Sequence, residues 1–201
     1  MPHVPARTAG PRFEPFRALR YPPGADLGAV IAPPYDVLSA AEVAELRARS
    51  PHNIVHVDVP PGEDPSRYAA SAHLLHRWRA EGVLVADPEP SLTIYRMRFV
   101  DGSGVARELV GVLGALEVVA EGAGKVLPHE RTTPKASTDR LDLTRATATN
   151  LSPVWGLSLA QGLTAVLAAP ADPLGSLVVD GVEHIVERLT DPGRIASVTE
   201  V

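Results

Sequence analysis

Residues 92–119 have the sequence LTIYRMRFVDGSGVARELVGVLGALEVV, and this stretch decides the fold class. Two runs rich in apolar residues, Leu92–Val100 and Val105–Val119, are separated by DGSG at positions 101–104. Short loops of Asp, Gly and Ser between such runs are typical of β-hairpins. We therefore predict two antiparallel strands joined by this turn.

The second of these strands is interrupted by Gly111 and Gly114. A glycine inside a strand often marks a bulge or a place where another part of the chain comes close. We expect one of these two features at each glycine.

The C-terminal part of the chain has a similar pattern. Asp180-Gly181 lies within the run Ser176–Thr190 and predicts a second hairpin. Asp191-Pro192 follows directly and is expected to begin a last short helix.

Helix start signals occur in the first half of the chain. Ser39 and Glu42 form a capping-box pattern, which predicts a helix over Ala40–Arg49. Asp64 and Pro65 form the next start signal, and that helix is expected to continue to about residue 81.

Three further stretches are expected to form or enter strands. NIVHVDV at 53–59 alternates apolar and polar residues, as a half-buried strand does. FEPFRALRYPP at 13–23 is expected to enter a first strand, and VWGLSLA at 154–160 to form a later one.

Helices and strands are mixed without the regular alternation of a parallel βαβ fold, and hairpins are prominent. This pattern predicts an α+β fold with a mixed, largely antiparallel sheet, hairpins and flanking helices. We expect a flexible N-terminal tail over residues 1–12 and a single α+β domain over 13–201.

Composition excludes several classes of protein. Apolar residues make up 45% of the 201 residues, enough for a folded core. No run approaches the roughly 18 to 20 apolar residues of a membrane span, and the N-terminus lacks the apolar segment of a secretory signal. The absence of cysteine excludes disulfides and thiolate chemistry. A cytoplasmic protein with no membrane partner is the expectation.

The net charge of −5 argues against DNA as a partner, because nucleic-acid binders usually have a basic surface. The basic residues are nearly all arginine, and the only two lysines are Lys125 and Lys135. Codon bias towards arginine explains the scarcity of lysine, but it does not explain why both lysines lie in one short stretch.

That stretch is KVLPHERTTPKASTDRLDLTR, residues 125–145, and it is the predicted functional centre. A polar loop that enters a helix, here expected over Thr138–Thr149, presents backbone N–H groups to an anion. Lysine and arginine side chains add charge-assisted hydrogen bonds to phosphate oxygens. The candidate anion-binding residues are Lys125, Arg131, Thr132, Lys135 and Arg140.

The same run contains an adjacent imidazole and carboxylate, His129 and Glu130, either of which is a candidate general base. Asp139 is a candidate supporting residue. The alternative interpretation remains open: a solvated loop whose charges cancel and in which Ser137 or Thr138 only caps the helix.

Weaker candidates lie elsewhere. Tyr35 and Asp36 follow a double proline in a stiff turn and are supporting candidates, although Asp36 has an equally ordinary role in stabilising the turn. His73 and His76 have metal-ligand spacing on a helix, but no third ligand is near in sequence, so no metal site is predicted.

Several motifs together resemble a known family. FEPFRALRY, APPYDVLS, NIVHVDVP and LPHERTTPKASTDRLDLTRATATNLSPVWGL are similar, in this order, to the bacterial and archaeal domain of unknown function 1015 family. The resemblance covers most of residues 13–198, and the PHERT block is its most specific part. Members of that family are in turn similar to the ParB and sulfiredoxin-like group, which includes free serine kinases and partition proteins.

The likeness to that group depends on a later Gly-His-His-Arg segment, which does not occur in this sequence. The chain resembles the N-terminal part of a longer family protein, so we expect it to hold half of a phosphate site, with self-association or a second chain completing it.

The resemblance implies a phosphotransferase like the free serine kinases. Glu130 would take the proton of a hydroxyl-bearing substrate, and basic side chains would hold the phosphoryl group, with Mg²⁺ and a phosphate donor as cofactors. The rival hypotheses are a non-catalytic nucleotide- or protein-binding module of ParB-like type, and an interaction fragment without a ligand.

Overall fold

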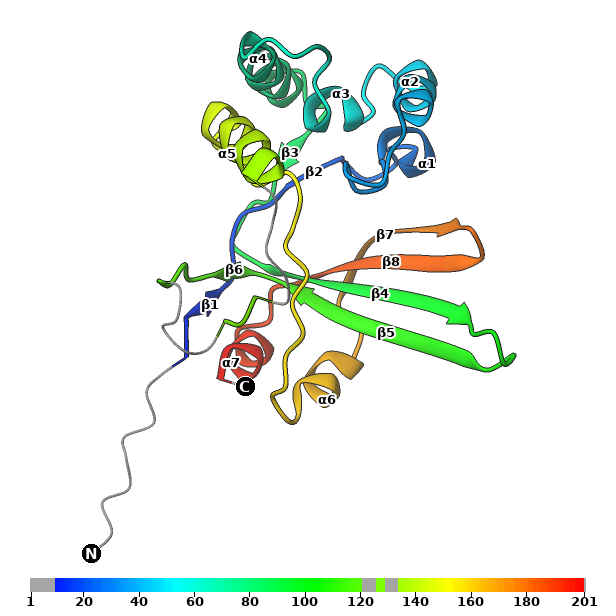
Figure 1. The fold of residues 1–201 in the computed structure, drawn as a ribbon. Coiled ribbons are helices and arrows are strands. Elements are labelled where there is room, and N and C mark those ends of the chain that lie inside the picture. Colours follow the sequence, from blue (N-terminus) through cyan, green and yellow to red (C-terminus); the bar gives the residue numbers. More distant parts are fainter. Residues whose placement is uncertain (1–9, 121–125, 129–133, 201) are drawn as a thin grey trace, which may run out of the picture.

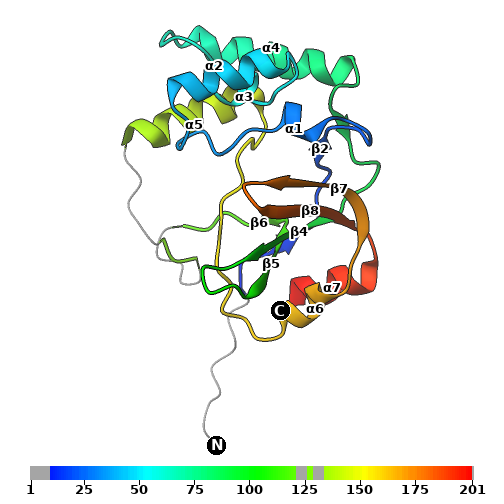
Figure 2. The same ribbon diagram turned by 90° about the vertical axis from the view of Figure 1, so that its right-hand side faces the viewer.

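The computed structural model describes residues 10–120, 126–128 and 134–200, except for the side chains of 134–137. Residues 1–9 of the expected tail therefore lie outside the described part. The fold is α+β, as predicted. Figures 1 and 2 show three layers: a group of helices, a sheet beneath it, and two short helices on the opposite face of the sheet.

The elements follow one another in a mixed order. They are β1 (Phe13–Glu14), β2 (Leu19–Arg20), α1 (Leu27–Val30), α2 (Ala40–Arg49), α3 (Val55–Asp58), α4 (Ser66–Ala80), β3 (Val85–Ala86), β4 (Leu92–Val100), β5 (Ala106–Leu113), β6 (Ala115–Leu116), α5 (Pro134–Thr147), α6 (Leu163–Ala168), β7 (Asp172–Val179), β8 (Val182–Leu189) and α7 (Pro192–Glu200). Helices α1 to α5 form the helical layer, and α6 and α7 cover the other face of the sheet (Figure 1).

The main sheet has the strand order β5-β4-β8-β7, and every neighbouring pair is antiparallel. Both predicted hairpins are present: β4 and β5 are joined across DGSG, and β7 and β8 across Asp180-Gly181. In the first turn, Asp101 accepts hydrogen bonds from the backbone of Ser103 and Val105. Local turn chemistry therefore fixes the first hairpin.

The two strand glycines behave differently. At Gly114 an added Cβ would come within 2.4 Å of the Phe13 ring, so the predicted close approach is confirmed there. Gly111 has open space around it, and β5 keeps an unbroken register with β4 at this point, so the expected irregularity is absent. The long predicted strand Val105–Val119 is instead two strands, because the chain turns from β4 towards β1 at Gly114.

The lower core lies between the sheet and the two short helices. Its buried members are Leu92, Ile94, Leu167, Leu189 and Val198. Arg96 is also buried here. Its Nε donates to Glu187 (2.8 Å), and its Nη2 donates to the carbonyls of Leu167 (2.7 Å) and Ala169 (3.0 Å). One charged side chain thus binds the end of α6 to the sheet.

A second core holds the helical layer together, with Val57, Leu75, Trp78 and Leu84 as its buried members. The two helices predicted here are confirmed. Ser39 and Glu42 exchange both capping-box hydrogen bonds at the start of α2, and α4 follows Pro65 as expected.

The prediction of a strand at NIVHVDV, residues 53–59, is wrong. Residues Val55–Asp58 form the single helical turn α3. The cause is a tertiary contact of Asn53, whose side-chain amide donates to the carbonyls of Ala29 and Ile31 (2.8 Å each). Its side-chain oxygen accepts from the Val55 N–H (3.0 Å), which fixes the start of the turn.

The strand predicted at VWGLSLA, residues 154–160, is also absent. Residues 150–162 pass from α5 to α6 across the sheet layer without pairing to any described strand (Figure 1). We call this segment the strap. The stretch at 13–23 forms only the two-residue strands β1 and β2, which pair with β6 and β3. In the described part of the chain, no helix has the length and apolar character needed to cross a membrane.

Candidate functional site

The most densely bonded group of charged side chains in the helical layer lies where α5 packs on α3 and α4. We call it the Arg140 cluster, and its members are Tyr35, Asp58, Arg67, Tyr68, Asp139, Arg140 and Ser152. They come from five separate segments of the chain. Helix α5 begins earlier than predicted, at Pro134, so Asp139 and Arg140 lie in its second turn.

Asp139 points from α5 towards α4. Its Oδ1 accepts hydrogen bonds from Arg67 Nη2 (2.6 Å) and from the Tyr68 hydroxyl (2.9 Å). Its Oδ2 accepts from Nε and Nη2 of Arg140 (3.0 and 2.6 Å). Both carboxylate oxygens are therefore occupied, and the carboxylate fixes α5 against α4.

Arg140 uses its remaining donors on α3. Nη1 donates to Asp58 Oδ1 (2.9 Å), and Nη2 donates to the Asp58 carbonyl (3.0 Å). The flat guanidinium also lies over the Tyr35 ring, with its central carbon 3.9 Å from the ring centroid, a favourable cation–π geometry. Arg140 therefore connects α5, α3 and the turn after the double proline.

Asp58 is the most buried carboxylate of the cluster, with 8% of the residue exposed. Besides Arg140, its Oδ1 is approached by the hydroxyl of Ser152 at 3.4 Å, a long hydrogen bond. Ser152 belongs to the strap, so the start of the strap is also held by the cluster.

The two carboxylates of the cluster have opposite pKa shifts. Burial raises the pKa of Asp58, and the charge and hydrogen bond of Arg140 offset this only in part. For Asp139, burial also acts to raise the pKa, but hydrogen bonds from Arg140 and Tyr68 and the charges of Arg140 and Arg67 outweigh it. The net pKa of Asp139 lies below its ordinary value, so the cluster favours its ionised form.

The guanidinium of Arg67 has further hydrogen-bond donors besides the one that binds Asp139. Its Nη1 donates to the Gly62 carbonyl (2.7 Å), and its guanidinium carbon lies 4.7 Å from the Tyr68 ring centroid. Its Nε is buried without a hydrogen-bond partner in the described part of the chain.

Three of the residues predicted from the sequence, Tyr35, Asp139 and Arg140, come together in this cluster. Asp36 does not: its side chain is exposed next to Tyr35. Lys135 lies in the first turn of α5, and its side chain is outside the described part. The remaining candidates also lie outside the described residues: Lys125, His129, Glu130, Arg131 and Thr132.

Four members of the cluster are not predicted from the sequence: Asp58, Arg67, Tyr68 and Ser152. Asp58 and Ser152 lie within the motifs NIVHVDVP and NLSP, which carry the family resemblance. Their place in these motifs is the sequence feature that could have identified them as site residues. Arg67 and Tyr68 had no such signal, because each acts through a contact between two helices.

The described residues do not fit a metal site. They contain no group of three or more His, Asp or Glu residues that could hold an ion, and the two carboxylates of the cluster are bound to arginines. His73 and His76 are exposed on α4. The described residues therefore supply no ligand set for Mg²⁺.

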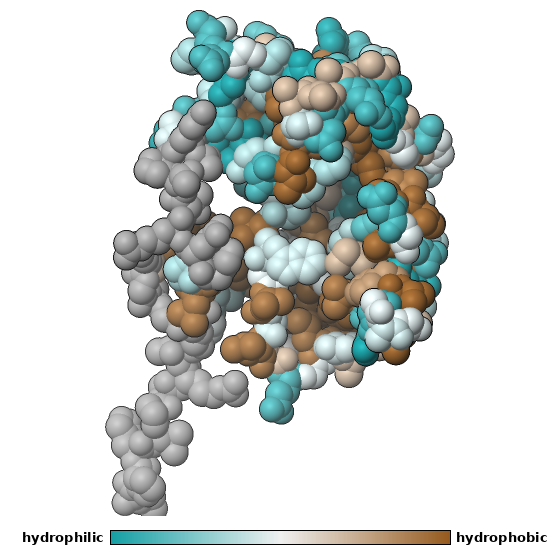
Figure 3. Space-filling view, turned by 45° about the vertical axis from the view of Figure 1, so that its right-hand side comes forward, coloured by the Kyte–Doolittle hydropathy of each residue, from teal (hydrophilic) through white to brown (hydrophobic). Residues whose placement is uncertain are grey.

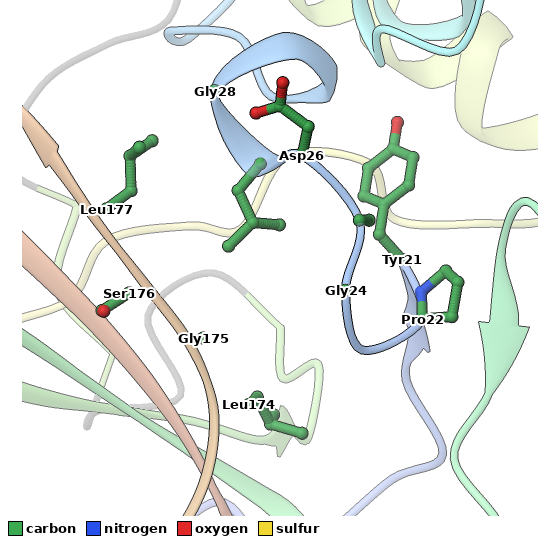
Figure 4. Close-up of a pocket in the computed structure, with 11 residues that line it drawn as sticks. Tyr21, Pro22, Gly24, Asp26, Gly28, Leu174, Gly175, Ser176 and Leu177 are labelled. Carbon is green, nitrogen blue, oxygen red and sulfur yellow. The ribbon is translucent and has the colours of Figure 1, made fainter.

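A separate hollow of about 300 Å³ lies between the turn around α1 and the edge strand β7 (Figure 4). Tyr21, Asp26 and Leu27 line one side, and Gly175 and Leu177 line the other. Asp26 is the only charged residue among those that line it, so this hollow does not suit an anion.

Comparison with known proteins gives a family match. A family model described as "Protein of unknown function (DUF1015)" matches residues 13–201. No curated protein and no solved structure matches the chain.

Proposed function

Because the chain belongs to the DUF1015 family of proteins of unknown function, its function has to be inferred from its own residues, and we propose that it is a phosphate-binding domain. The site we propose is the N-terminal end of α5 together with the polar segment 125–133 that precedes it.

The observation that carries this proposal is the way the Arg140 cluster holds α5. Asp139 and Arg140 lie about one and a half turns from Pro134 and bind α3, α4 and the Tyr35 turn at once. A helix N-terminus has free backbone N–H groups and a partial positive charge. When such an end is held rigidly, its N–H groups are oriented in advance, so binding an anion requires less ordering.

The basic residues near this end supply the rest of the site. Lys135 is in the first turn of α5, and Lys125 and Arg131 precede it in sequence. Lysine and arginine form charge-assisted hydrogen bonds with phosphate oxygens, and Thr132 adds a hydroxyl donor.

Arg140 has a different role in this proposal from the one expected from sequence alone. Its donors are used by Asp58 and Asp139. We therefore assign Arg140 and Asp139 as positioning residues that fix α5, and Lys125, Arg131, Thr132 and Lys135 as phosphate ligands.

A phosphoryl transfer reaction, as in the free serine kinases, is the catalytic form of this proposal. A substrate hydroxyl would attack the phosphorus of the donor while Glu130 takes its proton, and the donor's bond to its leaving oxygen would break. What supports it is the nearness of Glu130 to the proposed phosphate ligands in sequence, together with the family likeness.

A non-catalytic binding module is the second candidate, and one observation favours it. The strap exposes several large apolar side chains, as surfaces that bind other polypeptides do. Phosphate or nucleotide binding without turnover would then serve recognition of a partner.

The first test is a thermal-shift screen of phosphate, pyrophosphate, nucleotides and phosphoserine. A ligand of the folded state raises Tm by mass action, so at least one of these anions should raise Tm in the wild-type protein. Lys135→Ala should abolish the shift. Arg145→Ala is the matched control, because Arg145 is an exposed basic residue in the last turn of the same helix, and it should keep the shift. Tm unchanged with every anion would overturn the proposal.

The second test separates catalysis from binding. The protein is incubated with serine and with ATP, ADP or pyrophosphate, and phosphoserine is measured by ³¹P NMR. Product formation that is lost in Glu130→Gln, while the thermal shift persists, supports the phosphotransferase. A thermal shift without product in the wild-type protein supports the binding module.

A further inference from the structure

The strap carries the most exposed row of large apolar side chains in the described part of the chain. Val154 is 96% exposed, Trp155 64%, Leu157 86% and Leu159 95%. In Figure 3, teal surface covers most of the helical layer, and brown surface gathers over the sheet layer below it. Contiguous exposed apolar surface of this kind marks an interaction site.

The backbone in the middle of the strap is also unpaired with any backbone group in the described part of the chain. From Pro153 to Leu159, no backbone N–H or carbonyl forms a hydrogen bond with another described backbone group. The hydroxyl of Ser158 accepts the Ala160 N–H at 3.2 Å, which is a local contact. An extended chain with free donors and acceptors is complementary to another extended chain.

The sequence of the strap fits its own copy. In a strand, side chains at positions i, i+2 and i+4 share a face. Trp155, Leu157 and Leu159 have this spacing, and the other face carries Val154, Gly156 and Ser158. In an antiparallel pair of straps centred on Leu157, that residue would face the partner subunit's Leu157, and Trp155 would face the partner subunit's Leu159.

Charge favours the same partner. The protein has a net charge of −5, so two copies repel one another on most of their surfaces. From Asn150 to Ala171, however, the sequence has no Asp, Glu, Lys, Arg or His. A two-fold interface brings the same surface of both copies together, and an uncharged surface is the kind that permits this without repulsion.

From these observations we propose that the strap is a self-association site, at which two copies of the chain pair their straps as antiparallel β-strands about a two-fold axis at Leu157. This inference does not depend on phosphate binding at α5. It assigns to the strap a strand partner, which VWGLSLA does not have among the described residues.

The test is the oligomeric state of the full chain, measured by sedimentation velocity over a concentration series. The wild-type protein should shift from monomer to dimer as concentration rises. Leu157→Asp should remain monomeric, because two like charges would then face each other at the axis. Leu157 is highly exposed in one chain, so the substitution removes no internal packing.

Two comparisons make the result specific. Val118→Asp is the matched control, since Val118 is 97% exposed and outside the strap, and it should dimerise like the wild type. A mixture of Leu157→Asp with Leu157→Lys should form a one-to-one dimer, because opposite charges then meet at the axis. A wild-type protein that stays monomeric, a Leu157→Asp protein that still dimerises, or a mixture that stays monomeric would each overturn the proposal. A wild-type monomer would point to a different polypeptide as the occupant of the strap.

Discussion

The guanidinium of Arg140 lies over the ring of Tyr35, 3.9 Å from its centroid. These two residues are far apart in sequence, and each belongs to a motif quoted above. On its edges the same guanidinium binds Asp58 and Asp139. Arg140 therefore joins Asp139 in attaching the proposed phosphate-binding helix to the rest of the helical layer.

Removal of Arg140 should destabilise the fold measurably. Arg140→Ala leaves Asp58 buried without its charged partner, so we expect the free energy of unfolding to fall by about 2 to 3 kcal/mol. Arg140→Lys keeps the charge but loses the planar guanidinium that binds two carboxylates at once. It should lower the free energy of unfolding by roughly half as much. Urea unfolding measures both. Arg145→Ala, at the exposed end of the same helix, should stay within about 0.5 kcal/mol of the wild type, and a loss equal to that of Arg140→Ala would contradict the assignment.

Asp139 should make stability depend on pH. Its folded pKa lies below the ordinary value of 3.8, so the ionised group stabilises the fold above that value. This contribution is lost as pH falls through the folded pKa. Asp139→Asn should therefore be less stable than the wild type near neutral pH, and the gap between the two should narrow on acidification.

Urea midpoints measured from pH 7 down to the start of acid unfolding check this. Tyr68→Phe removes one of the hydrogen bonds to Asp139. Its plot of urea midpoint against pH should lie between those of the wild type and Asp139→Asn. Wild-type and Asp139→Asn profiles that run parallel would show that Asp139 does not contribute in this way.

Gly114 should tolerate no side chain, whereas Gly111 should. An added Cβ at Gly114 would lie 2.4 to 2.8 Å from three atoms of the Phe13 ring, so the ring must move. Gly114→Ala is expected to cost about 1 to 3 kcal/mol, and Gly111→Ala should be neutral or raise stability by up to about 1 kcal/mol. Thermal unfolding of Gly114→Ala and Gly111→Ala measures this difference. Equal Tm values for the two variants would refute the close packing of Phe13 on Gly114.

The buried ion pair of Arg96 and Glu187 should show strong coupling. Arg96→Leu leaves Glu187 buried without its charged partner, and Glu187→Leu leaves Arg96 with only the longer ion-pair contact to Glu108 (3.4 Å), each at a cost of about 3 to 5 kcal/mol. The double variant removes both charges, so it should be much more stable than the sum of the single losses predicts. A double-mutant cycle by urea unfolding measures the coupling energy, and simple additivity would mean that the two side chains do not stabilise each other.

Features determined by neighbouring residues were predictable from the sequence. The capping box of Ser39 and Glu42 and the DGSG turn depend on residues within a few positions of each other. The strand prediction for NIVHVDV is wrong because its alternation suits a strand, whereas the helical turn is selected by hydrogen bonds from Asn53 to the carbonyls of Ala29 and Ile31. A local pattern contains no information about such a partner.

The candidate site was predictable in part for the same reason. Asp139 and Arg140 belong to a dense polar run that is visible in the sequence, whereas Asp58 and Arg67 join them only when α3, α4 and α5 pack together. The roles of Lys125, His129, Glu130, Arg131, Thr132 and Lys135 remain predictions, and the variants Glu130→Gln and Lys135→Ala test two of them.

Ser152 belongs to the strap by its backbone and approaches Asp58 with its hydroxyl at 3.4 Å. Only a few residues separate Ser152 from Leu157. The Arg140 cluster, which holds the proposed phosphate site, is therefore linked by a short covalent segment to the proposed pairing site of the strap. Coupling between two binding sites is reciprocal. If phosphate at α5 strengthens the pairing of two straps by some factor, then pairing strengthens phosphate binding by the same factor, and Ser152→Ala should bring that factor closer to one.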